Sequence, residues 1–402
     1  MLSKVAKYTF ASQSPVYIVA GKRTPIGTFL GKLSKIKATE LGSIAIKGAL
    51  NQANIPADQV DEVILGNVCA AGLGQSPARQ ASLGAGIPIG VPVTNINKVC
   101  ASGMKTLSFG AQSIALGQNN VVVTGGFENM SQVPFYVNNH RKGHGFGNQT
   151  LVDGLATDGL TDVYNNIAMG LCAEKTSTDL GLDRQIQDDF AISSYERTLE
   201  SIKTGRFKWE IEPVTISEKE GVLAEDEEPK RFQKDKMLKL RPAFSKTGVV
   251  TAANASKIND GACSIILMSE QKVKELGVTP LARIVSYADS EVDPIDFCIA
   301  PAKSGQRALE RAGMKVSQID YHEVNEAFSA TALANIKLLD LDIDRVNIYG
   351  GAVALGHPIG MSGSRIVLNL VNILKNQRAK YGMAGICNGG GGATSIIIEN
   401  LQ

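Results

Sequence analysis

The sequence SGMKTLSFGAQSIALGQNNVVVTGG, residues 102–126, decides the fold. It predicts a helix from about Ser102 to Leu116, followed by an apolar strand at Val121–Thr124 that two glycines end. The same alternation occurs earlier, with a strand at Val16–Ala20, a helix at Ala38–Gln52 and a strand at Val60–Leu65. Strands that are apolar throughout and alternate with helices favour a parallel α/β sheet covered on both faces.

The second half of the chain repeats this pattern. Residues 48–61 resemble residues 307–320, Ser102-Gly103 resembles Ser362-Gly363, and Val121–Gly126 resembles Met383–Gly389. Because the separation stays near 260 residues in all three comparisons, we interpret the chain as a duplicated α/β unit, with chance likeness of two ordinary segments as the alternative. The expected division is 15–130 with 247–279 for the first half and 280–402 for the second. Residues 131–246, which are more polar, form an insertion with a helix near Arg184–Lys203.

Composition excludes several classes of protein. The chain has 402 residues and a formal net charge of +2, which argues against nucleic acid as a partner. No stretch of 18 uncharged apolar residues occurs, so we expect no insertion into a membrane. The six cysteines are scattered without a Cys-x-x-Cys pair and there are four histidines, which argues against a disulfide framework and a zinc site.

The N-terminus differs from the rest of the chain. Residues 1–14 are basic and hydroxylated, and no acidic residue precedes Glu40. This composition is compatible with a short organelle-targeting extension, and a flexible tail is the alternative. The C-terminal residues carry no Ser-Lys-Leu peroxisomal signal.

Cys100 is the first candidate for chemistry. It lies in NKVCASGMK, residues 97–105, where an apolar strand meets a helix. A thiol at a helix N-terminus is expected to have a lowered pKa, because the macrodipole and unpaired amides favour the thiolate. The alternative is a small buried hydrophobic residue.

His357 is the second candidate. It lies in GGAVALGHPIG, residues 350–360, where glycines and Pro358 predict a rigid loop. A histidine of the core seldom needs such a setting, so we expect a catalytic role. His322, on a predicted strand at Tyr321–Val324, is expected to be structural.

Two further side chains follow predicted strands. Cys387 ends the strand Met383–Ile386 and precedes four glycines, 389–392, whose amides are free to bind an anion. A phosphate-binding loop and a loose turn are the alternatives for this segment. Asn325 lies where the strand Tyr321–Val324 gives way to a helix.

All four candidates therefore lie near the carboxyl ends of strands, the edge at which ligands bind in α/β sheets. Two thiols, one imidazole and one amide suggest acyl transfer through a thioester. In this hypothesis one cysteine carries the acyl group, His357 activates it, and the second cysteine moves a proton.

The motifs at residues 97–105, 325–328, 350–363 and 387–392 resemble the signature motifs of the thiolase family. The likeness covers Val16 to Glu399 and is closest to the biosynthetic branch, especially its mitochondrial form. It implies a layered α-β-α-β-α thiolase fold of two βαβαβαββ halves with an inserted loop domain. It also implies a homotetramer (a dimer of dimers), a location in the mitochondrial matrix rather than the cytoplasm, and reversible conversion of two acetyl-CoA into acetoacetyl-CoA and CoA.

The resemblance also implies roles for single residues. Cys100 would be the acylated nucleophile, and Cys387 the acid/base at the substrate α-carbon. His357 would activate Cys100 and, with a water held by Asn325, form one oxyanion hole. The backbone amides of Cys100 and Gly389 would form the second.

The same resemblance places coenzyme A, as substrate and product, on the insertion, and it implies no organic prosthetic group. Arg231 and Lys236 would meet the nucleotide, Ser256 the pantetheine, and Met169 would lie near the acyl pocket. Tyr195 is also expected among the residues that bind coenzyme A. Phe297 matches a position associated with tolerance of 2-methyl substrates, although Cys298 and Ala168 depart from the usual residues beside these motifs. A potassium site would use the residues Tyr195, Ala252, Ala253, Ala255 and Val353.

Other functions stay open at this point. A 3-ketoacyl-CoA thiolase of β-oxidation would run the same chemistry with a wider acyl pocket. A decarboxylating condensing enzyme would prefer a histidine or glutamate where this chain has Cys387. A non-catalytic acyl-CoA binding protein would not need all four reactive side chains.

Overall fold

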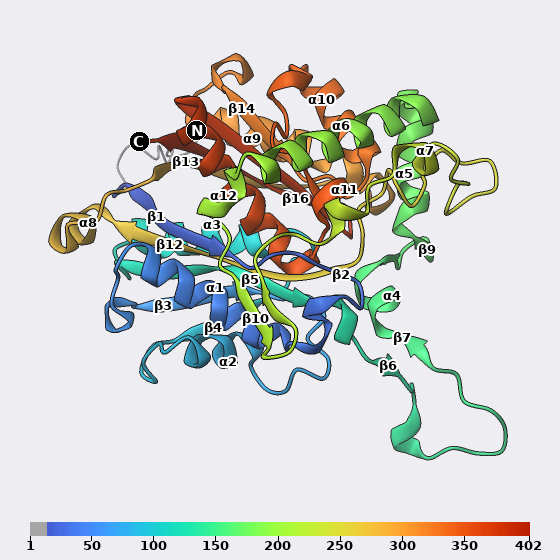
Figure 1. The fold of residues 1–402 in the computed structure, drawn as a ribbon, viewed down its shortest axis with the longest axis horizontal. Helices are drawn as coiled ribbons and strands as arrows, with labels where there is room; N and C mark the ends of the chain where they lie inside the picture. Colours follow the sequence, from blue (N-terminus) through green and yellow to red (C-terminus); the bar gives the residue numbers. More distant parts are fainter. Residues whose placement is uncertain (1–13) are drawn as a thin grey trace, which may run out of the picture.

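The computed structural model describes residues 14–402. The expected targeting extension therefore lies outside the described residues, apart from Ser14. One mixed sheet of ten strands runs through the molecule (Figure 1). Its order is β14-β15-β16-β13-β1-β12-β5-β3-β4, with β2 paired to β12. The strands are β1 Val16–Arg23, β2 Gly27–Thr28, β3 Glu62–Gly66, β4 Val93–Ile96, β5 Val121–Asn129, β12 Asn259–Ser269, β13 Ala282–Glu291, β14 Tyr321–Val324, β15 Tyr381–Asn388 and β16 Gly392–Asn400.

The expectation of a parallel sheet is wrong for most of these strands. Only β3 with β4, β3 with β5, and β14 with β15 run parallel, whereas the remaining pairs are antiparallel. The strands β15 and β16 are joined by a tight turn, so they have to run in opposite directions. A strand that is buried on both faces is apolar throughout whether its neighbours run parallel or antiparallel to it. The composition of a strand therefore does not reveal its direction in the sheet.

The duplication is confirmed by the strand order. The order β1-β12-β5-β3-β4 of the first half matches β13-β16-β15-β14 in the second, where a single parallel bridge from His322 to Val346 replaces the fifth strand. The two halves meet where β1 pairs with β13 through only two residue pairs, Tyr17 with Arg283 and Ile18 with Ala282. Figure 1 shows the first half in blue and teal, with its β12 and α8 in gold, and the second half in orange and red.

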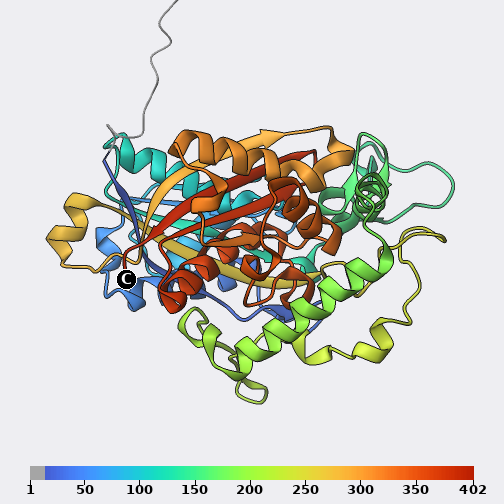
Figure 2. The same ribbon diagram turned by 90° about the horizontal axis from the view of Figure 1, so that it is seen from above.

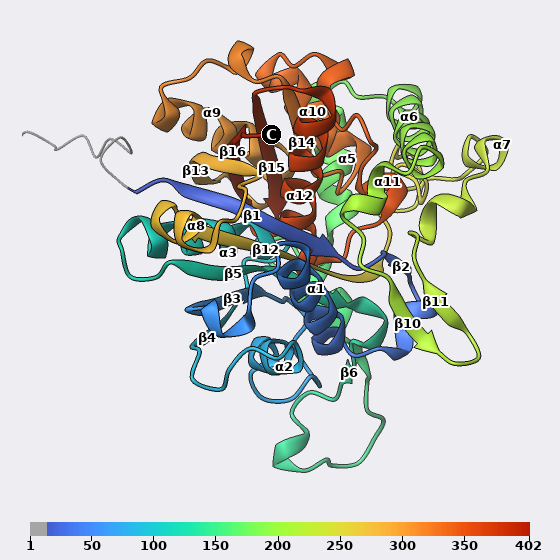
Figure 3. The same cartoon turned by 60° about the vertical axis from the view of Figure 1, so that its left-hand side comes forward.

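Helices form three layers around the two halves. The helices α1 (Ala38–Gln52) and α2 (Pro77–Gly84) cover the first half, and α9 (Ala300–Ala312) and α10 (Ser329–Leu339) lie on the second. Between them α3 (Ser102–Ala115) packs against α12 (Ile359–Gln377), and both helices contact strands of both halves. Every residue of α12 from Ile359 to Leu374 is buried, as expected of a helix enclosed on all sides. The arrangement is the layered α-β-α-β-α fold that the sequence resemblance implied (Figure 3).

The insertion is a series of short elements that extends along one side of the molecule (Figure 2). Its long helix, α6, spans Arg184–Lys203 as predicted, and the side chain of Asp183 caps it by accepting from the Ile186 N–H. The other elements are the hairpins β6 Phe135–Tyr136 with β7 Val152–Asp153, β8 Thr161–Asp162 with β9 Ile167–Ala168, and β10 Val214–Ser217 with β11 Gly221–Leu223, and the helices α4 Gly154–Gly159, α5 Met169–Leu180 and α7 Lys234–Met237. The helix α8, Glu270–Leu276, follows β12.

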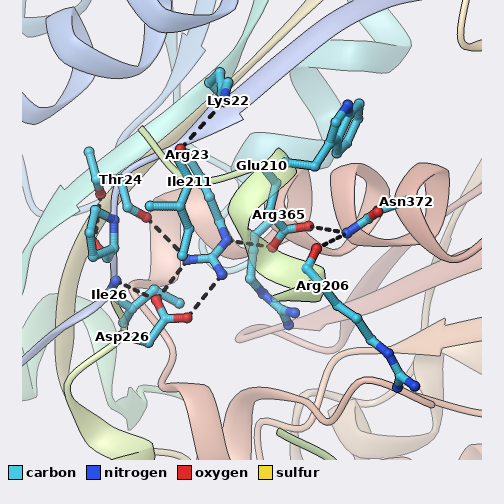
Figure 4. Close-up of polar contacts among 12 residues, drawn as sticks. Lys22, Arg23, Thr24, Ile26, Arg206, Glu210, Ile211, Asp226, Arg365 and Asn372 are labelled. Atoms are coloured by element: carbon cyan, nitrogen blue, oxygen red, sulfur yellow. Dashed lines mark hydrogen bonds and ion pairs between the residues drawn. The ribbon is translucent and has the colours of Figure 1, made fainter. Parts of the chain in front are cut away.

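A buried ion-pair cluster attaches the insertion to the central sheet (Figure 4). Arg23, in the last position of β1, donates through Nε to Glu210 at 2.7 Å and through both terminal nitrogens to Asp226 at 2.7 and 2.9 Å. All three side chains are at most 1% exposed. Because Glu210 and Asp226 both belong to the insertion, one guanidinium links two of its segments to the first half.

Two sequence expectations need adjustment around the predicted loop at residues 350–360. The segment contains a one-turn helix, α11 (Ala352–Leu355), and α12 already begins at Ile359. Within 350–360, only residues 350, 351 and 356–358 are therefore non-helical. In the part of the chain that the structure describes, none of the helices has the length and apolar character needed to cross a bilayer.

Candidate active site

Cys100 follows β4 and precedes α3, as the sequence indicated. Its turn is fixed by Ser102, whose hydroxyl accepts from the Lys98 N–H at 2.8 Å and donates to the Val99 carbonyl at 2.6 Å. Val99 has a φ of +46°, which is rare for a β-branched residue and stores strain of about 1–3 kcal/mol. This turn leaves Cys100 partly exposed, on the wall of a cavity of about 560 Å³.

The expected lowering of the Cys100 pKa is wrong. Burial raises the pKa of this thiol to about 12 and outweighs the main-chain N–H groups of Gly389 and Cys100, which pull it down. Desolvation of the thiolate is a tertiary effect that the strand–helix junction did not reveal. Cys100 therefore rests as a thiol, and its reactivity requires a base.

His357 lies on the same cavity wall and has the features of that base. Its Nδ1 is 2.6 Å from the Ser362 hydroxyl, which donates its own hydrogen to the Pro358 carbonyl at 2.8 Å. The hydroxyl therefore accepts from Nδ1–H, and this assigns the imidazole lone pair to Nε2. Nε2 is buried and has no hydrogen-bond partner among the described residues. Burial lowers the pKa of His357 to about 3, so the ring is neutral.

The second thiol, that of Cys387, lies one residue before the end of β15 and is completely buried. Burial raises the pKa of Cys387 well above its ordinary value, and negative charge on Cys100 raises it further. A methyl group added at Gly389 would contact Val99 and Met169, so the segment after Cys387 lies against the turn that carries Cys100. Gly390 and Gly391 have φ near +90°, which explains the glycines of this hairpin turn. The two thiols and the imidazole thus belong to one region of the molecule.

Asn325 directly follows β14, and its N–H donates to the Gly385 carbonyl at 3.0 Å. Both polar atoms of its side chain are buried without a partner among the described residues. Buried amides are nearly always hydrogen-bonded to protein or to ordered water. This side chain is therefore available to hold a water molecule or a ligand.

The helices α3 and α12, which follow Cys100 and His357, touch through glycines. A Cβ at Gly103 on α3 would lie 2.9 Å from the Gly360 carbonyl oxygen and from the Ser364 nitrogen on α12. A Cβ at Gly363 would meet the main chain of Met104 in the same way. The first turns of α3 and α12 are therefore in direct main-chain contact, just after Cys100 and His357.

Glu128, on β5, is a positioning residue that sequence reasoning missed. Its carboxylate accepts from the Asn67 side chain at 2.8 Å and from the N–H groups of Val68, Cys69 and Gly360 at 3.0, 3.1 and 3.0 Å. It thus ties the loop after β3 to the first turn of α12. An acid within an otherwise apolar and glycine-rich strand was the available signal. Burial raises its pKa to about 7.

Comparison with known proteins explains this constellation. The family model described as "Thiolase, N-terminal domain" matches residues 16–271, and the one described as "Thiolase, C-terminal domain" matches residues 278–400. The chain belongs to the thiolase family.

Several similar curated proteins carry the same activity name. A probable acetyl-CoA acetyltransferase of Dictyostelium discoideum is 53% identical and covers 98% of this chain and 96% of its own. The mitochondrial acetyl-CoA acetyltransferase of Rattus norvegicus is 52% identical, covering 96% of this chain and 91% of its own. The solved Acat5 thiolase of Ascaris suum, in complex with coenzyme A, has a TM-score of 0.93 at 46% identity and covers 96% of this chain and 100% of its own.

The residues expected to bind coenzyme A in this thiolase are divided between two neighbouring cavities. Met169, Ser256 and Phe297 line the cavity that contains Cys100 and His357. Tyr195 and Lys236 line a smaller cavity of about 290 Å³. Both cavities share lining residues, namely Glu228, Arg231, Ala252 and Lys257. Arg231 and Lys257 therefore lie where the two cavities adjoin, whereas Lys236 lines only the smaller one.

The two departures from the family pattern have different positions. Ala168 lines the reaction cavity at the N-terminus of α5. Cys298 is fully buried behind Phe297, where its sulfur accepts from the Thr331 hydroxyl at 3.2 Å. Phe297 itself packs edge-on against Phe328 with ring centroids 6.4 Å apart. Only Ala168 therefore changes the cavity wall directly.

The expected potassium ion does not fit the residues found at its site. The carbonyls of Ala253, Ala255 and Val353 accept hydrogen bonds from the Lys257 ammonium at 3.2, 2.9 and 2.9 Å. Burial lowers the pKa of Lys257 to about 8, which leaves the side chain mainly charged at neutral pH. Oxygens that already bind one cation in this way offer a poor site for a second, since the two charges repel. Among the described residues there is also no group of three or more His, Cys, Asp or Glu side chains that could hold a metal.

Proposed function

We propose that this thiolase is an acetyl-CoA C-acetyltransferase, which condenses two acetyl-CoA to acetoacetyl-CoA and CoA and catalyses the reverse thiolysis. The observation that carries the proposal is one cavity lined by Cys100, Gly389 and a neutral His357 with a free Nε2. Curated relatives at 50–53% identity carry this activity name, which supports the choice of acetyl-CoA as substrate.

The first half-reaction transfers an acetyl group to the enzyme. Nε2 of His357 takes the proton of the Cys100 thiol as the sulfur attacks the thioester carbonyl of acetyl-CoA. The carbonyl oxygen becomes an oxyanion that the N–H groups of Cys100 and Gly389 stabilise, as they stabilise the Cys100 thiolate. The C–S bond to CoA then breaks, and the leaving thiolate receives the proton of the Cys387 thiol. Cys387 thereby becomes a thiolate, and His357 keeps the proton that it took from Cys100.

The second half-reaction forms the carbon–carbon bond. The Cys387 thiolate removes a proton from the α-carbon of a second acetyl-CoA, and the enolate attacks the acetyl group on Cys100. His357 and a water held by Asn325 stabilise the enolate oxygen, a role that the two unpartnered polar atoms of Asn325 support. The raised pKa of Cys387 makes its thiolate a stronger base, which suits a weakly acidic carbon. The C–S bond to Cys100 then breaks, and the released Cys100 thiolate takes its proton back from His357. Both thiols and the neutral imidazole are thereby restored.

Substitution of the two cysteines tests these roles separately. Cys100→Ser should abolish turnover and the acetyl label that intact-protein mass spectrometry detects after incubation with acetyl-CoA. Cys387→Ala should still accept the acetyl group but fail to form or cleave acetoacetyl-CoA. Full activity of the Cys100→Ser protein would refute the mechanism.

Coenzyme A binding is proposed for the insertion, residues 131–246, and its junction with β12. Arg231 and Lys236 would contact the nucleotide and Ser256 the pantetheine, with Tyr195 near the nucleotide side, and Met169 and Phe297 beside the acyl group. Their division between two adjoining cavities supports this order. Charge reversal at Arg231 should raise KM for acetyl-CoA without a comparable change in kcat. Because its site does not fit, potassium has no role in this proposal.

We also propose a homotetramer, a dimer of dimers, with the loop between β6 and β7 as a contact. This loop projects from the body of the molecule (Figure 1), and Phe135, Phe146 and Leu151 expose large apolar side chains on and beside it. Light scattering coupled to size exclusion measures the mass directly. A monomer in solution would contradict the proposal.

A broader 3-ketoacyl-CoA thiolase is the second candidate. The solved human mitochondrial 3-ketoacyl-CoA thiolase in complex with CoA also has a TM-score of 0.93, at 38% identity. Thiolysis rates with acetoacetyl-CoA, 2-methylacetoacetyl-CoA and longer ketoacyl-CoA esters separate the two functions. Equal or higher kcat/KM with the longer esters would favour the second.

A mitochondrial location is proposed on the composition of residues 1–14. The relatives include both the mitochondrial rat protein and a cytosolic acetyl-CoA acetyltransferase of Gibberella zeae. Import into isolated mitochondria of the full chain, compared with a chain that begins at Pro15, tests it. Equal import of both chains would contradict a targeting function for these residues.

A further inference from the structure

Lys257 forms a set of buried hydrogen bonds to main-chain carbonyls that has no role in the proposed mechanism. It lies between Ser256, on the reaction cavity, and β12. Its Nζ donates to three main-chain carbonyls at 2.9–3.2 Å, those of Ala253, Ala255 and Val353. These bonds use all three donors of the ammonium group. The Tyr195 ring lies 5.2 Å away on another side, close enough for a cation–π contact.

We propose that the Lys257 ammonium is a covalently attached substitute for a monovalent metal ion, and that this protein does not respond to potassium. A ring of carbonyl oxygens beside an aromatic face is an environment for a compact cation, and here the chain supplies that cation itself. The donor–acceptor distances are those of ordinary charge-assisted hydrogen bonds. A potassium ion in contact with the same oxygens would lie next to Nζ, where the two positive charges repel.

The position of Lys257 explains what such a cation does. Val353 belongs to α11, which leads directly to Gly356 and His357. Its N–H donates to Glu326 at 3.0 Å while its carbonyl accepts from Lys257, so the main chain of Val353 is held through both of its peptide groups. The other two carbonyls belong to the segment just before Ser256. Lys257 therefore joins the wall that carries the base to the wall proposed to contact pantetheine, and it acts as a positioning residue.

Thermal unfolding in matched salts tests the proposal without reference to any reaction. The unfolding temperature of the unsubstituted protein should be the same in KCl and in NaCl of equal ionic strength. Lys257→Ala should unfold at least about 2 °C lower in NaCl, because buried carbonyls lose their donor. KCl should restore part of this loss in a concentration-dependent way, since the truncation frees space for the ion.

Two further variants serve as controls. Lys257→Met keeps most of the side-chain volume without the charge, so it should lose stability as Lys257→Ala does but gain nothing specific from KCl. Lys337→Ala removes an exposed lysine that donates to one carbonyl, that of Leu180, and should change neither value. If Lys257→Ala does not fold in NaCl, it is purified in KCl and then exchanged, and loss of structure on exchange supports the proposal.

A potassium-specific rise in the unfolding temperature of the unsubstituted protein would overturn the inference. So would a Lys257→Ala protein as stable as the Lys337→Ala control, or one that KCl does not restore. A second readout rests on the proposed function: KM for acetoacetyl-CoA in thiolysis should rise severalfold in Lys257→Ala and fall again with KCl. If the unsubstituted protein shows no thiolysis in either salt, the proposed function fails, whereas the unfolding result still decides the role of Lys257.

Discussion

Replacement of Arg23 by methionine should strongly destabilise the protein. The substitution removes the only side chain that forms an ion pair with Glu210 or Asp226 among the described residues (Figure 4). Two carboxylates that are at most 1% exposed would be left without their cation. Breaking one partner of a buried ion pair typically costs about 3–5 kcal/mol, and here one change breaks two pairs. We therefore expect a loss at the upper end of that range.

The measurement is the free energy of unfolding from urea titration. Arg345→Met is the matched control, because Arg345 pairs with Asp342 at 3.5 Å with both side chains more than half exposed. An exposed pair of this kind contributes at most about 1 kcal/mol. A triple variant, Arg23→Met with Glu210→Gln and Asp226→Asn, removes both buried charges and should recover part of the loss.

The pH dependence gives an independent check. Burial already raises the pKa of Glu210, and Arg23 opposes that rise, so the substitution should raise the pKa further. A carboxyl whose pKa is raised in the folded state binds its proton there more tightly than in the unfolded state. Its contribution is therefore most favourable at low pH and is lost as the pH rises through the folded-state pKa. The deficit of Arg23→Met should shrink between pH 8 and about pH 5. A deficit no larger than that of Arg345→Met, or one that grows on acidification, would refute the reasoning.

Three further outcomes are expected. Ser362→Ala removes the acceptor of the His357 Nδ1–H and should lower kcat by about tenfold to a hundredfold, which is part of what a positioned base provides. Ser364→Ala is the control, because the Ser364 hydroxyl donates to the Met361 carbonyl, and its kcat should change little. Equal kcat values for the two variants would contradict the tautomer assigned to His357. Glu128→Gln places an amide donor among four N–H donors and should reduce the free energy of unfolding by about 1–3 kcal/mol. The control is Glu270→Gln on the surface helix α8. A loss no larger than that of the control would argue that Glu128 does not hold α12 to the loop after β3. Burial lowers the pKa of His357 to about 3, so the pH profile of kcat/KM should show no ionisation near pH 6.5, where a free histidine titrates. A fall in kcat/KM below pH 6.5 that shifts to another pH in Ser362→Ala would show that His357 titrates there and would disprove the neutral base.

The sequence predicted those features that local pattern determines. The strand Tyr321–Val324 and the helices Ala38–Gln52 and Arg184–Lys203 have the predicted limits, because apolar periodicity and capping residues act over short distances. The direction of most strands was predicted wrongly, since it depends on which strands become neighbours after the chain folds.

The candidate site shows the same division. Cys100 and His357 were found from their settings of glycine and helix start, and the structure brings both to one cavity. The net shift in the Cys100 pKa was not found, because desolvation sums over atoms that are remote in sequence. Lys257 was missed because it stands within a segment whose binding groups are main-chain carbonyls, and every residue has one. The sequence shows that Lys257 is charged, but it does not show which carbonyl oxygens accept hydrogen bonds from it.

The glycine contact between α3 and α12 has a consequence for how this enzyme tolerates change. Since the two helices meet backbone to backbone at Gly103 and Gly363, no side chain acts as a spacer between the turn that carries the nucleophile and the turn that carries the base. Substitutions that change the size of neighbouring core residues can alter stability, but they change the distance between the reacting atoms very little. Any residue larger than glycine is therefore excluded at these two positions, because even one added methyl group would push the helices apart.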